Sequence, residues 1–144
     1  RTFQRTKGFT DPGDIPEWTI RKQKTNYELN KTRVAMCRRL GCNQATGTDW
    51  NGSGPYELAN EIWAMSELGG YSPLEALSCC TKIGAEVLGL ERLIGTIEEG
   101  KLADLVLFQG NPLEDLRVLG VKEKIRLVMK GGEVIVNKGL RLQE

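Results

Sequence analysis

Apolar residues recur at helical spacing between residues 25 and 40. The positions that share one face lie three or four residues apart, and they are Leu29, Arg33, Met36, Cys37 and Leu40. Gly41 follows the last of them and suits the left-handed position that closes many helices. The pattern therefore predicts a helix over residues 25–40. Residues 1–20 contain turn formers and no periodic pattern, so they are expected to form a loop.

A second helix is predicted over residues 56–68. Its apolar positions repeat at the same helical intervals, and they are Leu58, Ile62, Met65 and Leu68. The pair Gly69-Gly70 ends the pattern.

A third helix has the clearest local start in the chain. Ser72 can cap its first turn, Pro73 fits the first helical position, and Glu75 completes a capping box. This helix is expected to reach Lys82. One or two further turns are expected over residues 85–88, ended by Gly89.

Strand patterns occur at three places. Residues 43–46 form a short segment after the first helix and predict a brief strand. Residues 103–108 are an almost continuous apolar run, which is typical of a strand buried on both faces. Residues 125–130 and 133–137 flank Gly131-Gly132, the pattern of a two-residue hairpin.

The predicted elements change type near residue 92. Residues 1–92 are predicted to be helical with one short strand, and residues 93–144 to be β-rich. We therefore interpret the chain as two structural parts that meet at this point.

Composition sets limits on partners and location. The chain has 144 residues, enough for one domain, and its 40% of apolar residues can form a core. A net charge of +1 gives no reason to expect nucleic acid or an anionic membrane as partner. No apolar stretch approaches the roughly 20 residues that span a bilayer, and no secretory signal is visible. The first residue is Arg1, not Met, which we interpret as a processed or truncated chain.

The spacing of the cysteines and the absence of histidine limit the kinds of catalytic and metal-binding site that this chain can form. The four cysteines, at positions 37, 42, 79 and 80, form no C-x-x-C pair. Buried free thiols in a cytoplasmic protein are therefore a better interpretation than a disulfide framework or a Cys-only zinc site. The sequence has no histidine, which excludes His-based acid–base chemistry within this chain and removes the commonest ligand of catalytic zinc.

Asp49 is the candidate for chemistry. It follows the predicted strand 43–46 and precedes a loop of Gly and Ser residues. At the carboxyl end of a parallel strand, a carboxylate can bind a metal or take a proton from metal-bound water. A structural Asp that forms a turn with Asn51 fits the same pattern. Asn51 and Ser53 could line a substrate pocket, or simply connect a strand to a helix.

A set of motifs in fixed order resembles the C-terminal third of the amidohydrolase superfamily, and in particular imidazolonepropionase-like and Xaa-Pro dipeptidase-like enzymes. The resemblance covers roughly residues 25–137. The motifs are Leu40-Gly41 through Gly47-Thr48-Asp49, Ser72-Pro73-Leu74-Glu75-Ala76-Leu77, Gly84 to Leu90, Gly95 to Val106, Asn111-Pro112-Leu113, and Val128 to Gly132.

The resemblance implies an α/β fold in two parts. Residues 1–92 would be the terminal βα part of a (β/α)8 TIM-like barrel, with residues 43–49 as its eighth strand. Residues 93–144 would be a segment of a small β-sandwich, a composite domain built from both ends of the full chain.

The resemblance also implies an activity. The family hydrolyses amide, cyclic amide or dipeptide C–N bonds with water activated by a divalent metal, most often zinc. Asp49 matches the residue that approaches the metal and shuttles the proton, and the other ligands belong to earlier strands. The substrate would be a small amide or dipeptide. The His that some relatives carry after this Asp is replaced here by the loop Trp50-Asn51-Gly52-Ser53.

Two alternatives remain beside the fragment of an active hydrolase. The chain could be a stand-alone structural or interaction module left after loss of the catalytic part, or a degenerate relative that binds without turnover. One barrel strand cannot close a barrel, and half a sandwich leaves open edges. We therefore expect the isolated chain to be inactive, and to associate with itself or with a missing N-terminal segment.

Overall fold

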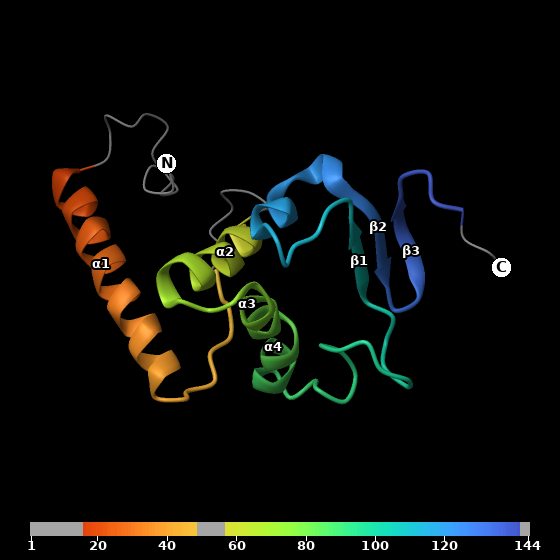
Figure 1. The fold of residues 1–144 in the computed structure, drawn as a ribbon, viewed down its shortest axis with the longest axis horizontal. Coiled ribbons are helices and arrows are strands. Elements are labelled where there is room, and N and C mark those ends of the chain that lie inside the picture. Colours follow the sequence, from red (N-terminus) through yellow and green to blue (C-terminus); the bar gives the residue numbers. More distant parts are fainter. Residues whose placement is uncertain (1–15, 49–56, 142–144) are drawn as a thin grey trace.

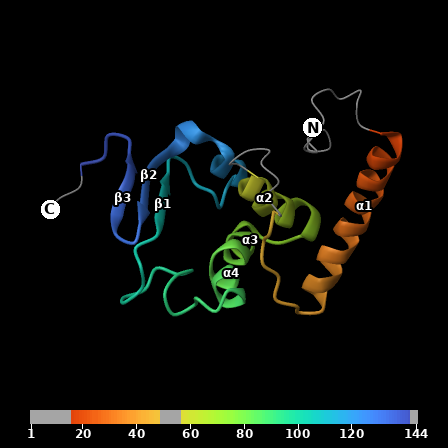
Figure 2. The ribbon, with the colours of Figure 1, turned by 180° about the vertical axis from the view of Figure 1, so that it is seen from behind.

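The structure, a computed structural model, describes residues 16–48 and 57–141. Its helices are α1 (Glu17–Arg39), α2 (Glu57–Gly69), α3 (Pro73–Cys80) and α4 (Lys82–Val87), and its strands are β1 (Leu105–Phe108), β2 (Ile125–Lys130) and β3 (Glu133–Asn137). Helix α1 and the sheet lie at opposite ends of the molecule, with the other helices between them (Figure 1). The view from behind shows the same order (Figure 2).

Helix α1 is longer than the sequence pattern predicts. It begins at Glu17, directly after Pro16, so the expectation of a loop through residue 20 is wrong at its end. The first turns have little apolar periodicity because they are exposed. They are supported locally instead, by the Glu17–Arg21 pair at 3.7 Å.

The C-terminus of α1 ends as predicted. Gly41 has a φ of 72°, the left-handed conformation that glycine adopts without a Cβ clash. The amide of Gly41 donates to the Arg38 carbonyl at 3.0 Å, and the amide of Cys42 donates to the Cys37 carbonyl at 2.9 Å. These two bonds form a Schellman motif, which turns the chain sharply into the next segment.

The predicted strand over residues 43–46 does not form in the structure. Residues 42–48 are not part of any helix or strand. A strand needs a neighbour whose backbone groups complete its ladder. The segment finds one such bond among the described residues, from the Thr46 amide to the Cys79 carbonyl at 3.4 Å.

The capping box is confirmed, and the helix that follows is interrupted. The Ser72 hydroxyl accepts from the Glu75 amide, and the Glu75 carboxylate accepts from the Ser72 amide at 2.7 Å. The continuous helix predicted to Lys82 instead breaks at Thr81, whose φ of −109° and ψ of −85° leave the helical region. Helix α4 follows, and Gly89 with φ 68° comes shortly after its end.

The three strands form one antiparallel sheet in the order β1-β2-β3. Val106 pairs with Val128, and Val128 pairs with Val136. The predicted hairpin is confirmed: Gly131 and Gly132 have φ values of 57° and 88°, which a two-residue turn of the primed type requires.

Strand β1 is exposed, contrary to the prediction of a strand buried on both faces. Val106 and Leu107 are 51% and 49% exposed. The sheet of the described chain has no further strand beyond β1 and no second sheet packed on this strand. The apolar run therefore correctly predicts a strand, but the predicted burial of that strand is wrong.

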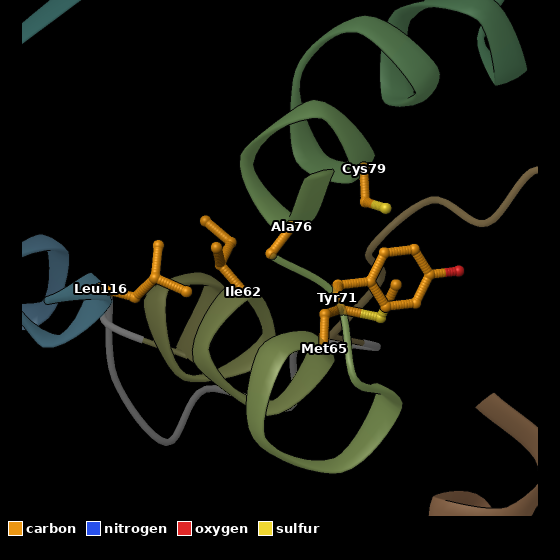
Figure 3. Close-up of a cluster of buried hydrophobic side chains, with 6 residues drawn as sticks. All are labelled: Ile62, Met65, Tyr71, Ala76, Cys79 and Leu116. Carbon is orange, nitrogen blue, oxygen red and sulfur yellow. The ribbon is translucent and has the colours of Figure 1, made fainter. Parts of the chain in front are cut away.

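The core lies between α2, α3 and the 3-10 helix η3 (Leu116–Gly120). Figure 3 shows the buried cluster, which consists of Ile62, Met65, Tyr71, Ala76, Cys79 and Leu116. Leu116 joins the chain segment before β2 to the helices. None of the helices in the described ranges is long and apolar enough to cross a membrane.

Candidate functional site

The residues that the sequence singles out for chemistry lie outside the described residues. Asp49, Asn51 and Ser53 all fall within residues 49–56. Their predicted roles as metal ligand, proton acceptor and substrate contacts therefore stay predictions. The structure describes what immediately surrounds them in sequence, namely residues 42–48 and helix α2.

Residues 42–48 are held by a side chain that sequence reasoning did not single out. The Nε2 atom of Gln44 donates to the Val34 carbonyl of α1 at 3.1 Å, and it also donates to the hydroxyl of Tyr71. Two residues later, the Thr46 amide donates to the Cys79 carbonyl at the end of α3. This carbonyl is among the last of its helix and has no partner within it, so it is available to the segment.

Tyr71 is itself fixed from several sides. Its ring is buried in the core cluster, and its hydroxyl points away from the other side chains of that cluster (Figure 3). The Arg38 guanidinium lies over the ring at 5.2 Å from the centroid, a cation–π contact. Arg38 also binds Glu75, whose carboxylate caps α3. We call Gln44, Tyr71, Arg38 and Glu75 the anchor network.

The electrostatics of the anchor network keep Tyr71 protonated and Glu75 ionised at neutral pH. Burial, and next the nearby Cys79, raise the pKa of Tyr71, so the phenol stays protonated and accepts from Gln44. The backbone hydrogen bond from Ser72, followed by the Ser72 hydroxyl and Arg38, holds the pKa of Glu75 below its usual value. The network is therefore suited to hold a backbone segment, and not to transfer protons.

The described residues offer no metal site of their own. No group of three or more His, Cys, Asp or Glu side chains within residues 16–48 and 57–141 is placed to hold a metal ion. The four cysteines are free thiols, as the spacing predicts. Cys79 is buried, but Cys42 is exposed, so the expectation of buried thiols is wrong at that position. Burial, with a smaller effect of Cys79, raises the pKa of Cys80 to about 11, which makes it a poor nucleophile or metal ligand.

The fold defined by these helices and the small sheet occurs in known enzymes. A solved structure of a putative prolidase from Bifidobacterium longum superimposes with a TM-score of 0.79 and 28% identity, over 94% of this chain and 33% of that one. The model of the amidohydrolase family matches residues 22–135. The chain belongs to the amidohydrolase family, which confirms the resemblance of its motifs.

Curated relatives agree with this assignment. The chain is 37% identical over 114 residues to the imidazolonepropionase of Geobacillus kaustophilus (strain HTA426), covering 75% of this chain and 27% of that protein. It is 34% identical over 103 residues to the ochratoxinase of Aspergillus niger, covering 71% of this chain and 21% of that protein. The chain therefore spans about a quarter of the length of these relatives.

Sequence reasoning missed Gln44 and Tyr71 because neither position stands out in a periodic pattern. One signal was available for Gln44: it is a long polar side chain inside the short segment expected to be a strand. Tyr71 lies between a Gly-Gly stop and a capping box, where the pattern indicates only a turn. The contact between them depends on how α1 packs against α2 and the core cluster, which the local sequence does not encode.

Proposed function

We propose that this chain is the C-terminal part of a metal-dependent amidohydrolase that hydrolyses C–N bonds of small amides, cyclic amides or dipeptides. The observation that carries the proposal is the amidohydrolase family match over residues 22–135. The relatives named imidazolonepropionase, ochratoxinase and prolidase support it. The chain spans 27% of the imidazolonepropionase and 21% of the ochratoxinase. This small share supports the idea that it works within a longer polypeptide.

The proposal also extends to architecture. Residues 1–92 would supply the last βα part of a TIM-like barrel, and residues 93–144 a segment of a small β-sandwich. The exposed strand β1 fits this arrangement, because further layers on the two faces of the sheet would cover Val106 and Leu107, which point to opposite faces. Residues 42–48, which lack a ladder partner here, would pair with a barrel strand.

A divalent metal, zinc in our proposal, would supply activated water when bound. The donors of this chain do not fit such an ion by themselves. The sequence has no histidine, and the described residues bring no three ligands together. Asp49 alone cannot hold a catalytic zinc, which takes three protein ligands. The remaining ligands would have to come from another part of the polypeptide, and the isolated chain should be inactive.

The proposed roles in this chain are few. The Asp49 carboxylate would approach the metal and accept a proton during water attack. Asn51 and Ser53 would contact the substrate. The anchor network would hold the backbone that leads into Asp49.

The first test is to sequence the transcript or genomic locus upstream of the codon for Arg1. We expect a His-x-His pair after a β-strand and two later histidines in the same reading frame. The corresponding polypeptide should then hydrolyse an Xaa-Pro dipeptide or a cyclic amide and contain bound metal. Asp49→Asn should lower kcat by about 10²- to 10⁴-fold, as loss of a proton acceptor does.

Glu91→Gln is the matched control, because it removes one exposed carboxylate and should leave kcat unchanged. A start codon just before Arg1 with nothing upstream would overturn the enzyme proposal. The chain would then be a stand-alone structural or interaction module. Equal kcat for the wild type and Asp49→Asn would overturn the role of Asp49.

A further inference from the structure

Residues 42–48 leave helix α1 and run toward Asp49 with few backbone partners of their own. The segment is tied at alternate residues: the side chain of Gln44 bonds toward α1 and Tyr71, and the backbone amide of Thr46 bonds to the Cys79 carbonyl at 3.4 Å. The two ties therefore hold the segment at two points, two residues apart along the chain.

Of the two ties, only the one made by Gln44 depends on a side chain. A primary amide has two N–H donors, and here Nε2 faces two acceptors, the Val34 carbonyl and the Tyr71 hydroxyl. Using both donors fixes the orientation of the amide as well as its position. Methionine has nearly the same length and shape but can make neither bond.

The core cluster holds both acceptors of Gln44. Val34 lies in the C-terminal half of α1 and packs against the core cluster. Tyr71 belongs to that cluster, and Arg38 covers its ring. Gln44 thus ties a segment with little secondary structure to two elements that the core already holds in place.

We propose that Gln44 is a positioning residue, which fixes residues 42–48 through its bonds to Val34 and Tyr71 and thereby sets where the chain delivers Asp49. The catalytic consequence of this anchoring rests on the proposed function. The anchoring itself is a property of the described residues and can be tested without activity.

Hydrogen–deuterium exchange tests the anchoring. In Gln44→Met, the Thr46 amide and its neighbours should exchange about two- to tenfold faster, since each lost bond contributes a modest free energy. Tyr71→Phe removes one of the two acceptors and should give a smaller increase. This second variant keeps the aromatic core, so it also covers the case in which Gln44→Met fails to fold. Amides inside α3, such as that of Ala76, should not change in either variant.

Gln109→Met is the matched control, because it makes the same substitution at an exposed glutamine. Its exchange over residues 42–48 should equal that of the wild type. Equal exchange in Gln44→Met and Gln109→Met would overturn the inference, whatever the enzyme activity.

Kinetics on the polypeptide used for the proposed function test the catalytic consequence. Normalised to the folded fraction, Gln44→Met should lower kcat on an Xaa-Pro dipeptide by about tenfold with little change in KM, because displacement of a catalytic group affects the transition state. The pH profile of kcat should shift as well, which a merely structural role would not cause. Faster exchange with an unchanged kcat and pH profile would overturn the positioning role. Absence of activity in the wild type would instead overturn the proposed function, and exchange alone would then decide on the anchoring.

Discussion

The Nη2 atom of Arg38 donates to both carboxylate oxygens of Glu75, at 2.9 and 3.0 Å, and so joins the last turn of α1 to the first turn of α3. Glu75 uses the same carboxylate to cap the Ser72 amide at 2.7 Å. One side chain therefore starts a helix and connects it to another. This double role makes Glu75 a point where pH and stability should be coupled.

Lowering the pH should destabilise the fold through Glu75. Its folded-state pKa is held below the usual value, first by the Ser72 backbone and then by the Ser72 hydroxyl and Arg38. A depressed pKa means that the carboxylate stabilises the fold above its unfolded pKa and loses this effect as pH falls through the folded pKa. Denaturant midpoints from about pH 7 to about pH 3 should decrease less steeply in Glu75→Gln. Glu91→Gln is the control, and an identical slope in both variants would contradict this account.

Gly95 should tolerate alanine far less well than Gly100. Both have positive φ, +97° and +85°, so both substitutions carry backbone strain. A Cβ at Gly95 would lie 2.6 Å from the Ala85 Cβ and 3.1 Å from the Thr81 carbonyl, whereas one at Gly100 meets nothing within 4 Å. We expect Gly95→Ala to lower the free energy of unfolding by about 1–3 kcal/mol more than Gly100→Ala. Chemical denaturation measures the difference, and equal losses would show that the gap beside α4 can accept a methyl group.

Asp104 should fix the β2–β3 hairpin. Its two oxygens accept from the Lys130 ammonium at 2.8 Å and the Gly131 amide at 2.6 Å. Asp104→Asn keeps an acceptor for Gly131 but loses the charge, and Asp104→Ala loses both. Thermal unfolding should therefore rank the wild type above Asp104→Asn and Asp104→Asn above Asp104→Ala.

The same carboxylate gives a pH test. The Lys130 hydrogen bond and then the Gly131 amide hold the pKa of Asp104 below its ordinary value. Its contribution should be present above the unfolded pKa and be lost as pH falls through the folded pKa. The pH slope should be reduced in both variants. Equal melting temperatures of the wild type and Asp104→Ala would exclude a structural role for this side chain.

The thiols should differ widely in reactivity. Cys42 is exposed, whereas burial raises the pKa of Cys80 to about 11. Because the thiolate is the reactive form, alkylation near pH 8 should modify Cys42 about tenfold or more faster than Cys80. Tandem mass spectrometry of peptides cut after glutamate, which separates Cys42 from Cys80, gives both rates. In denaturant the two rates should become similar. Equal rates in the folded chain would contradict the partly buried position of Cys80.

The raised pKa of Cys80 also predicts that the fold loses stability at alkaline pH. The pKa of Cys80 in the folded chain is raised above its ordinary value of 9.0, so the neutral thiol stabilises the fold fully below about pH 9. The contribution is lost as pH rises through about 11. Denaturant midpoints measured across this range should fall less in Cys80→Ala than in the wild type. The same fall in both would assign the alkaline loss to another group, such as Tyr71.

The sequence by itself determined the local features of this protein. The capping box of Ser72 and Glu75, the glycine end of α1 at Gly41 and the Gly131-Gly132 hairpin all appear in the structure as the pattern predicts. Each depends on a few neighbouring residues, whose backbone preferences and hydrogen bonds are set within one or two turns of chain. The order of the motifs also sufficed to indicate the family.

Only the tertiary structure decided what surrounds those elements. Residues 43–46 form no strand and β1 is exposed, because a ladder and a buried face depend on neighbours that no local pattern describes. The contact of Gln44 with Tyr71 likewise joins positions 27 residues apart, and it exists because α1 and α3 pack on one core. Spacing along the chain predicts which residues share a face, but the packing of distant elements determines what that face meets.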